Sequence, residues 1–199
     1  MRFAVVIVPG LRDQVDAHWQ TLLSARLRAS VVSDLVVDVP PMGRVNLSCA
    51  ARVDAIEYAV CAIAGPVIAV AHSGGCIALA RWAMQSQRVL HGALLATPPD
   101  FAVPMPEGYP TLSALQEAGW FPLPESMLPF PSIVAASRDD PLASYQRAAE
   151  MARAWGSELV DAGTVGHLNP ASGYGEWLQA ETLIARLRIN PAATTAAHH

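Results

Sequence analysis

Residues 67–80 read VIAVAHSGGCIALA. A short apolar run containing β-branched side chains leads into the small residues around Ser73, and an alanine-rich pattern with helical spacing follows at once. This order predicts a strand, a sharp turn with Ser73 at its tip, and a helix. Such a turn is typical of a nucleophile elbow, in which the serine takes a strained backbone conformation that only small neighbours tolerate. Gly75 is expected to let helix and strand approach closely, whereas Ala71 stands where the motif usually has a glycine.

The size and composition of the chain fit one α/β domain. With 199 residues, of which 52% are hydrophobic, the chain can bury a sizeable core. Strand-like and helix-like segments alternate, which favours a doubly wound, mainly parallel six-stranded sheet. We predict a single domain over residues 1–190 and a disordered tail over residues 191–199. Besides the elbow strand and its helix, which runs to about residue 87, the expected strands are 2–8, 30–39, 89–96, 131–137 and 158–161, and the expected helices are 17–27, 47–64, 142–155 and 175–188.

The charge of the chain narrows its possible partners. The formal net charge is −4 and no basic patch is evident, which argues against a nucleic-acid or anionic-membrane partner. No apolar segment is long enough to span a membrane. All 13 basic residues are arginines, so chemistry that needs a Schiff-base lysine or a P-loop lysine is excluded. The sequence leaves the oligomeric state open.

The three cysteines indicate a reduced protein. They are odd in number and show no C-x-x-C spacing, so we expect a cytoplasmic location. Cys76 is a rival nucleophile, because it lies early in the helix after the turn and helix N-termini lower the pKa of a thiol. We expect it instead to be buried on the helix face as a small hydrophobic side chain.

Residues 98–131 depart from the alternating pattern. The segment contains nine of the chain's 16 prolines together with five aromatic residues. A connection of this length inside a compact domain is often a binding loop or lid, although a proline-stiffened connection without function has the same composition. Because the segment follows a strand at the end where α/β sheets bind ligands, we expect Trp120 and Phe121 to line the substrate pocket.

The two further groups that a catalytic serine requires are present in the expected order. The serine needs a general base, and the base needs a carboxylate to orient it. In α/β-hydrolases the order is serine, acid, histidine, each on a loop at the carboxyl end of a strand. Asp139 and Asp140 follow the fifth expected strand, and His167 lies in a glycine-containing loop after the sixth. Adjacent residues cannot both face His167, so we expect one aspartate to orient it and the other to be solvated, to cap, or to meet Arg138.

The loops around Ser73 hold further candidates. An oxyanion hole needs two backbone N–H groups directed at the developing charge. We expect Gly74, which follows Ser73, and Leu11, in the bend after the first strand, to supply them. His18, near the start of the first helix, either contacts substrate or serves as a helix cap or surface residue. His72 is expected to pack or hydrogen-bond behind the turn, because neighbouring side chains across an elbow point apart.

Five short motifs resemble the small serine hydrolases typified by retinoblastoma-binding protein nine and its bacterial relatives. They extend over nearly the whole chain and are VPG at 8–10, HW at 18–19, HSGG at 72–75, DDP at 139–141 and GH at 166–167. The resemblance implies a compact α/β-hydrolase without a large cap domain and a triad of Ser73, Asp140 and His167. In that family the aspartate directly before the proline is the triad acid, which favours Asp140 over Asp139. Retinoblastoma binding is not carried over to this chain.

The residues and the resemblance together predict a serine hydrolase that cleaves small carboxylic esters through an acyl-enzyme intermediate. Ser73 attacks, His167 transfers the proton, and Asp140 holds His167 in the required tautomer. No metal or organic cofactor is required, and the expected partner is a small-molecule ester, with thioesters and amides open to the same chemistry. The alternative is a protein of this fold that binds or regulates with little turnover, and such a protein has no chemical need for all three residues.

Overall fold

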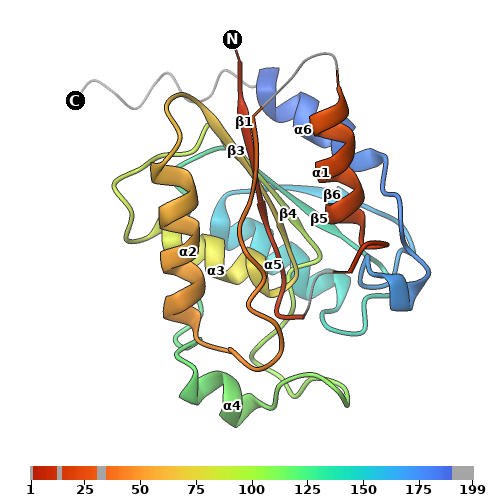
Figure 1. Cartoon of the computed structure of the whole chain (residues 1–199). Helices are drawn as coiled ribbons and strands as arrows, with labels where there is room; N and C mark the ends of the chain where they lie inside the picture. The colour runs from red at the N-terminus through yellow and green to blue at the C-terminus, as the bar shows by residue number, and fades with distance from the viewer. Residues whose placement is uncertain (1, 13–14, 31–34, 190–199) are drawn as a thin grey trace.

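The computed structural model describes residues 2–12, 15–30 and 35–189, and it has helices on both sides of one sheet (Figure 1). The strands are β1 (Ala4–Val8), β2 (Leu35–Asp38), β3 (Val67–His72), β4 (Gly92–Ala96), β5 (Ser132–Ala136) and β6 (Glu158–Asp161). The helices are α1 (Trp19–Ala29), α2 (Cys49–Cys61), α3 (Gly74–Ala83), α4 (Leu112–Glu117), α5 (Tyr145–Trp155) and α6 (Gln179–Ile189), with a short 3₁₀ helix over Pro170–Ser172. The tail predicted over residues 191–199 lies outside the described residues.

The strand order confirms the predicted doubly wound α/β fold. The strands lie in the order β2-β1-β3-β4-β5-β6, and each neighbouring pair is parallel. The chain order reverses between β1 and β3, and the crevice at such a switch point is where open α/β sheets bind ligands. Val8 of β1 and Ala71 of β3 are register partners. The loop after β1 and the turn at Ser73 therefore begin side by side.

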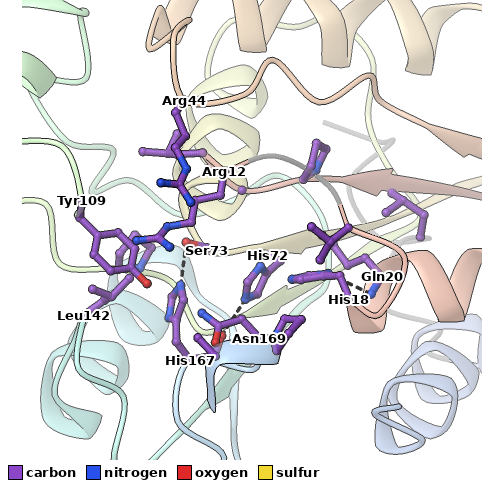
Figure 2. A pocket seen from close by; sticks show the side chains of 18 of the residues that line it. Arg12, His18, Gln20, Arg44, His72, Ser73, Tyr109, Leu142, His167 and Asn169 are labelled. Carbon is purple, nitrogen blue, oxygen red and sulfur yellow. Dashed lines mark hydrogen bonds between the residues drawn. The ribbon is translucent and has the colours of Figure 1, made fainter. Parts of the chain in front are cut away.

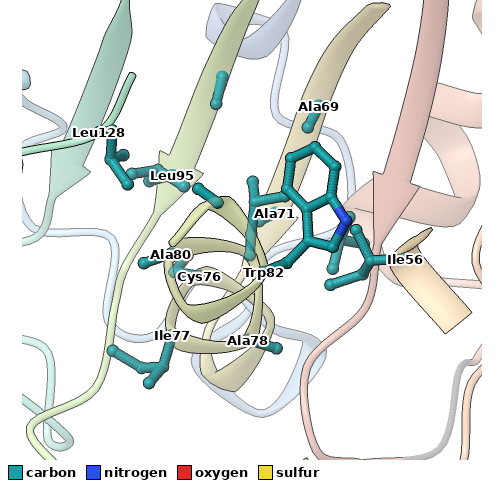
Figure 3. Close-up of a cluster of buried hydrophobic side chains, with 14 of the residues drawn as sticks. Ile56, Ala69, Ala71, Cys76, Ile77, Ala78, Ala80, Trp82, Leu95 and Leu128 are labelled. Atoms are coloured by element: carbon teal, nitrogen blue, oxygen red, sulfur yellow. The ribbon is translucent and has the colours of Figure 1, made fainter. Parts of the chain in front are cut away.

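Both faces of the sheet are covered, which explains the continuous apolar runs of its central strands. Every residue of β1, β3, β4 and β5 is buried, and successive side chains enter opposite cores. Helices α1 and α6 cover one face, while α2, α3 and α5 cover the other. In the core between the sheet and helices α2, α3 and α5, Trp82 of α3 and Ile56 of α2 lie over the small side chains Ala69 and Ala71 of β3 (Figure 3). The alanine that replaces the usual glycine of the elbow is thus part of this core.

The main difference from the sequence prediction lies in the 98–131 segment, which contains helix α4. This helix begins after Thr111, whose hydroxyl accepts the N–H of Ala114 (3.2 Å) in an ordinary N-cap. Apart from the 3₁₀ helix over Pro170–Ser172, only element ends differ elsewhere. The predicted 30–39 strand is seen as β2, with residues 31–34 outside the described ranges, the fourth strand begins at Gly92, and the elbow helix ends at Ala83. Such ends depend on where pairing and capping occur, which local propensity does not specify.

Within the described ranges, no helix combines the length and the apolar character needed to cross a bilayer. The same residues include no group of three or more His, Cys, Asp or Glu side chains arranged to bind a metal ion.

Candidate active site

Ser73 lies in the turn between β3 and α3, in a backbone conformation that L-residues rarely adopt. Its φ is 54° and its ψ is −132°, and its N–H donates to the carbonyl of Ala96 at the end of β4 (3.0 Å). Strained residues of this kind persist only where the surroundings hold them, and they cluster at functional sites. A Cβ atom on Gly75 would lie 2.5 Å from the carbonyl oxygen of Pro9. Gly75 therefore permits the close approach of helix and strand that the sequence predicts.

Ser73, His167 and Asp140 form a continuous chain of hydrogen bonds. Ser73 Oγ lies 2.8 Å from His167 Nε2 (Figure 2), and His167 Nδ1 lies 2.9 and 3.0 Å from the two carboxylate oxygens of Asp140. The side chains of His167 and Asp140 are each only 4% exposed. When Nδ1–H donates to Asp140, the lone pair of Nε2 faces the serine hydroxyl. This arrangement can remove the proton of Ser73.

Backbone contacts hold the acid and the base on their loops. Asp140 follows β5, and its Oδ1 also accepts the N–H of Leu142 (2.9 Å). His167 lies in the loop after β6, and its own N–H donates to the hydroxyl of Ser172 (3.0 Å). Because β3, β5 and β6 are parallel strands of one sheet, the three loops open at the same edge.

Asp139 serves the same loop in another way. Its Oδ1 accepts the Ser137 hydroxyl and the N–H of Gly166, each at 2.8 Å. These bonds, the Ser137 bond first, lower the pKa of the exposed Asp139 carboxyl. The exposed carboxylate therefore braces the loop before His167, and among the described residues it neither caps a helix nor pairs with Arg138. Arg138 pairs instead with Asp161 at the end of β6 (Nε to Oδ2, 2.9 Å), because its long side chain reaches the neighbouring strand.

The two residues expected to form the oxyanion hole lie against each other beside Ser73. Leu11 is buried, and a Cβ atom on Gly74 would lie only 2.7 Å from Leu11 Cγ. A Cβ atom on Gly10 would likewise lie 3.1 Å from Ser73 Cβ. The bend after β1 is thus packed against the first turn of α3, which is where the topology predicted it.

Three histidine rings follow one another from the serine toward α1. His72 donates from Nε2 to the carbonyl oxygen of His167 (2.9 Å), and the ring centroids of these two residues are 5.0 Å apart. His18 lies next, 4.8 Å from His72, and its Nδ1 accepts the N–H of Gln20 (3.2 Å) as the N-cap of α1. His18 therefore caps the helix and also lines the cavity described below. The sequence placed His72 behind the turn but did not reveal that its partner is His167 itself.

Burial keeps both additional histidines neutral near pH 7. It lowers the pKa of His72 well below its usual value, and the charge of His167 acts in the same direction. Burial, followed by the charge of His167, lowers the pKa of His18 from 6.5 to about 4. Of these three histidines, His167 is the one whose ring contacts the Ser73 hydroxyl.

Acid should destabilise the fold through His18. Its folded pKa of about 4 lies below 6.5, so the unfolded chain binds the proton first as the pH falls. The stabilising contribution is complete above pH 6.5 and is lost toward pH 4. We expect His18→Asn, which keeps a cap acceptor, to reduce the loss of unfolding free energy between about pH 7 and pH 4.5 by about 1–2 kcal/mol. Urea unfolding at both pH values measures this, and equal losses in the two proteins would contradict it.

Cys76 does not compete with Ser73 as a nucleophile. It is fully buried among the apolar side chains of α3 and the sheet (Figure 3), and its Sγ donates to the carbonyl oxygen of Ala96 (3.4 Å). Burial raises the pKa of this thiol well above its usual value. A buried, protonated thiol is a weak nucleophile, so the structure matches the packing role expected for this residue.

A cavity of about 290 Å³ has Ser73 and His167 in its wall. Part of the wall comes from residues 99–109 of the long segment, which contribute Phe101, Met105 and Tyr109. Most of the remaining wall is apolar and comes from the loops after β1, β2 and β5 and from the 3₁₀ helix. Apolar walls with a few polar groups are typical of small-molecule sites.

Trp120 and Phe121 do not line this cavity, which corrects the expectation for the 98–131 segment. Trp120 is fully buried, and its indole N–H donates to the carbonyl of Leu47 (2.8 Å). Its ring packs edge-on against Phe101, with 5.2 Å between centroids. Phe121 packs partly buried against the core that α2, α3 and α5 cover. After α4 the chain turns back onto this core. Phe101 therefore lines the cavity, whereas Trp120 packs against the Phe101 ring on the core side.

The cavity wall also contains polar side chains that sequence reasoning missed. Arg12 and Arg44 line it, and so does Gln20 (Figure 2). The Gln20 amide donates to the carbonyls of Val8 and Val70, each at 3.0 Å, and thereby ties β1 to β3. The sequence signal that could have indicated Arg12 was its position directly after Leu11, the predicted oxyanion residue. No sequence signal pointed to Arg44.

Comparisons with solved structures show proteins of similar fold. A solved YdeN-like hydrolase from Pectobacterium atrosepticum is 30% identical, with 94% of this chain and 90% of that chain covered and a TM-score of 0.74. The ydeN gene product of B. subtilis is 17% identical, covers 96% and 100%, and has a TM-score of 0.73. The RedJ thioesterase of Streptomyces coelicolor, at 14% identity, 94% and 89% coverage and a TM-score of 0.60, shares the fold.

The family comparison is more specific than these structural similarities. A search among curated proteins finds no match. The family model described as serine hydrolase, however, matches residues 5–186, which include Ser73, Asp140 and His167. Because this match spans most of the sequence, the chain belongs to the serine hydrolase family.

Proposed function

We propose that this hydrolase cleaves small carboxylic esters through an acyl-enzyme, with Ser73, His167 and Asp140 as its triad. Ser73 Oγ attacks the ester carbonyl while His167 Nε2 accepts the hydroxyl proton. His167 then gives this proton to the departing alcohol oxygen, which leaves the acyl group on Ser73. Water attacks the acyl-enzyme in the second half, with His167 again as base, and releases the acid and free Ser73.

The observation that carries the proposal is the 2.8 Å contact between Ser73 Oγ and His167 Nε2, whose ring is paired with Asp140 on its other side. A nucleophile, a base and an orienting acid in sequence are the requirements for acyl transfer. We propose that the N–H groups of Gly74 and Leu11 stabilise the oxyanion, since both residues pack beside Ser73. The cavity of about 290 Å³ suits a small ester.

The alternative is a protein of this fold that binds a ligand with little turnover. Binding alone would not require a strained serine paired with a buried His–Asp couple, because strain and buried charge both cost stability. We also place the protein in the cytoplasm, which is supported by its three cysteines, all of which are free thiols.

Labelling with a fluorophosphonate probe tests the proposal. We expect the probe to modify the wild-type protein at Ser73, as mapped by mass spectrometry of its peptides, and to leave Ser73→Ala unlabelled. A panel of 4-nitrophenyl esters, thioesters and anilides would then rank the acyl substrates. Failure of the probe to label a folded wild-type protein would favour the binding alternative, and an adduct on Cys76 would move the nucleophile.

A further inference from the structure

The cavity carries positive charge although the chain as a whole has a formal net charge of −4. The charged groups that the structure describes in its wall are Arg12, Arg44 and the carboxylate of Asp38. Asp38 already has a cationic partner, because its Oδ2 accepts Arg28 Nη2 (2.7 Å). Among the described residues of the wall, arginines thus outnumber carboxylates, and a low-dielectric cleft of one sign concentrates ligands of the other sign.

Gly108 and Tyr109 hold the side chain of Arg12 in place in the cavity wall. Its Nη2 donates to the carbonyl of Gly108 (3.0 Å), and its Cζ lies 4.0 Å from the centre of the Tyr109 ring. The Tyr109 ring is in turn 6.5 Å from the ring of His167. Figure 2 shows Arg12, Arg44 and Tyr109 on one side of Ser73 and His18 on the other. The arginine is thus fixed in orientation before any ligand binds.

The guanidinium of Arg12 has donors to spare. The group has five N–H donors, and the structure gives it the one hydrogen bond to Gly108. Its Nε is buried and has no hydrogen-bond partner among the described residues. The fixed fork of a guanidinium matches a carboxylate. Because Arg12 lines the cavity, a carboxylate bound there can accept hydrogen bonds from its unused terminal N–H groups.

We propose that the natural substrate carries a carboxylate on a part of the molecule that does not react, and that Arg12 binds this group while the ester carbonyl lies at Ser73. This inference rests on the proposed ester hydrolysis. Arg44 lines the same side of the cavity. The wall also contains apolar side chains, among them Phe101 and Leu142. A monoester of an aliphatic dicarboxylic acid, or an ester of an acidic alcohol, fits this combination.

Two matched pairs of esters test the proposal. Mono-4-nitrophenyl adipate and 4-nitrophenyl heptanoate differ by a terminal carboxylate on the acyl chain, whereas 3-carboxyphenyl heptanoate and phenyl heptanoate differ by one on the leaving group. We expect one anionic ester to exceed its neutral partner about 10- to 100-fold in kcat/KM. Arg12→Met should remove this preference by slowing the anionic ester alone. Arg26→Met is the matched control, because Arg26 lies on α1 and pairs with Glu176 and Glu181.

The outcomes separate this inference from the proposed hydrolysis. Turnover without an anionic preference in either pair, or an equal loss on both members in Arg12→Met, would overturn the anion site and leave the hydrolase intact. Adipate binding to the Ser73→Ala protein, measured by calorimetry, needs no turnover. If no ester is hydrolysed but adipate binds, and Arg12→Met weakens it about tenfold or more, the anion site stands and the hydrolytic proposal fails.

Discussion

Replacing Ser73 with alanine should lower kcat/KM on an activated short-chain ester by about four orders of magnitude or more. The reason is chemical, because the base at His167 Nε2 would keep its position but lose the hydroxyl that lies 2.8 Å away. Activity of about 10³ over the reaction in water should remain through oxyanion stabilisation and binding. Initial rates with 4-nitrophenyl acetate measure the effect, and urea unfolding should give a stability near that of wild type.

Cys76→Ala is the control for this experiment. The thiol is buried with a raised pKa, so its removal should leave the rate within about threefold of wild type, although the loss of a packed side chain costs about 1 kcal/mol of stability. Activity that survives Ser73→Ala but disappears in Cys76→Ala would assign the chemistry to the thiol.

Asp140→Asn should lower turnover about 10²- to 10⁴-fold. The carboxylate holds the Nδ1–H form of His167 through two contacts of 2.9 and 3.0 Å. An asparagine amide can donate to Nδ1 instead, which places the ring proton on Nε2, and the ring then cannot accept a proton from Ser73. The kcat of the purified variant on the same ester measures this loss.

Asp139→Asn is the adjacent control, with an expected loss of less than about tenfold. Its carboxylate braces the loop at Gly166 and does not contact His167 in the structure, so the variant should affect loop stability more than chemistry. A reversed ranking of the two variants would make Asp139 the acid. Near-full activity in both would indicate a Ser–His dyad or another acid such as Asp100, which lies against Arg147 (3.4 Å).

The sheet and the positions of Ser73, Asp140 and His167 could be predicted because they depend on strand ends. Continuous apolar runs mark buried parallel strands, and every such strand ends at the same edge of the sheet. Residues that directly follow these apolar strands are therefore brought together regardless of the conformation of the loops. The role of Gly75 could be predicted for a similar reason, because the close contact that it allows is with the backbone at the end of β1.

Side chains inside long loops could not be placed in this way. Phe101 and Trp120 both lie in the proline-rich segment 98–131. The first lines the cavity, however, whereas the indole N–H of the second donates to the carbonyl of Leu47. Their directions depend on contacts with α2 and α3, which lie far away in the sequence. The same holds for His72, whose partner is 95 positions further along the chain. Arginines such as Arg12 and Arg44 are usually exposed in proteins, and no local sequence pattern distinguishes an arginine that lines a cavity from one that faces solvent.

The hydrogen bond from His72 to the carbonyl oxygen of His167 ties the nucleophile's strand directly to the loop that bears the base. Neither that bond nor the anchor from His167 to Ser172 involves residues 98–131, although Phe101, Met105 and Tyr109 from this segment form part of the cavity wall. The Ser73–His167 spacing and this part of the wall therefore depend on different hydrogen bonds. Exchanging Met105 or Tyr109 would change the shape of the space above Ser73 without removing either of the two bonds that fix the His167 loop.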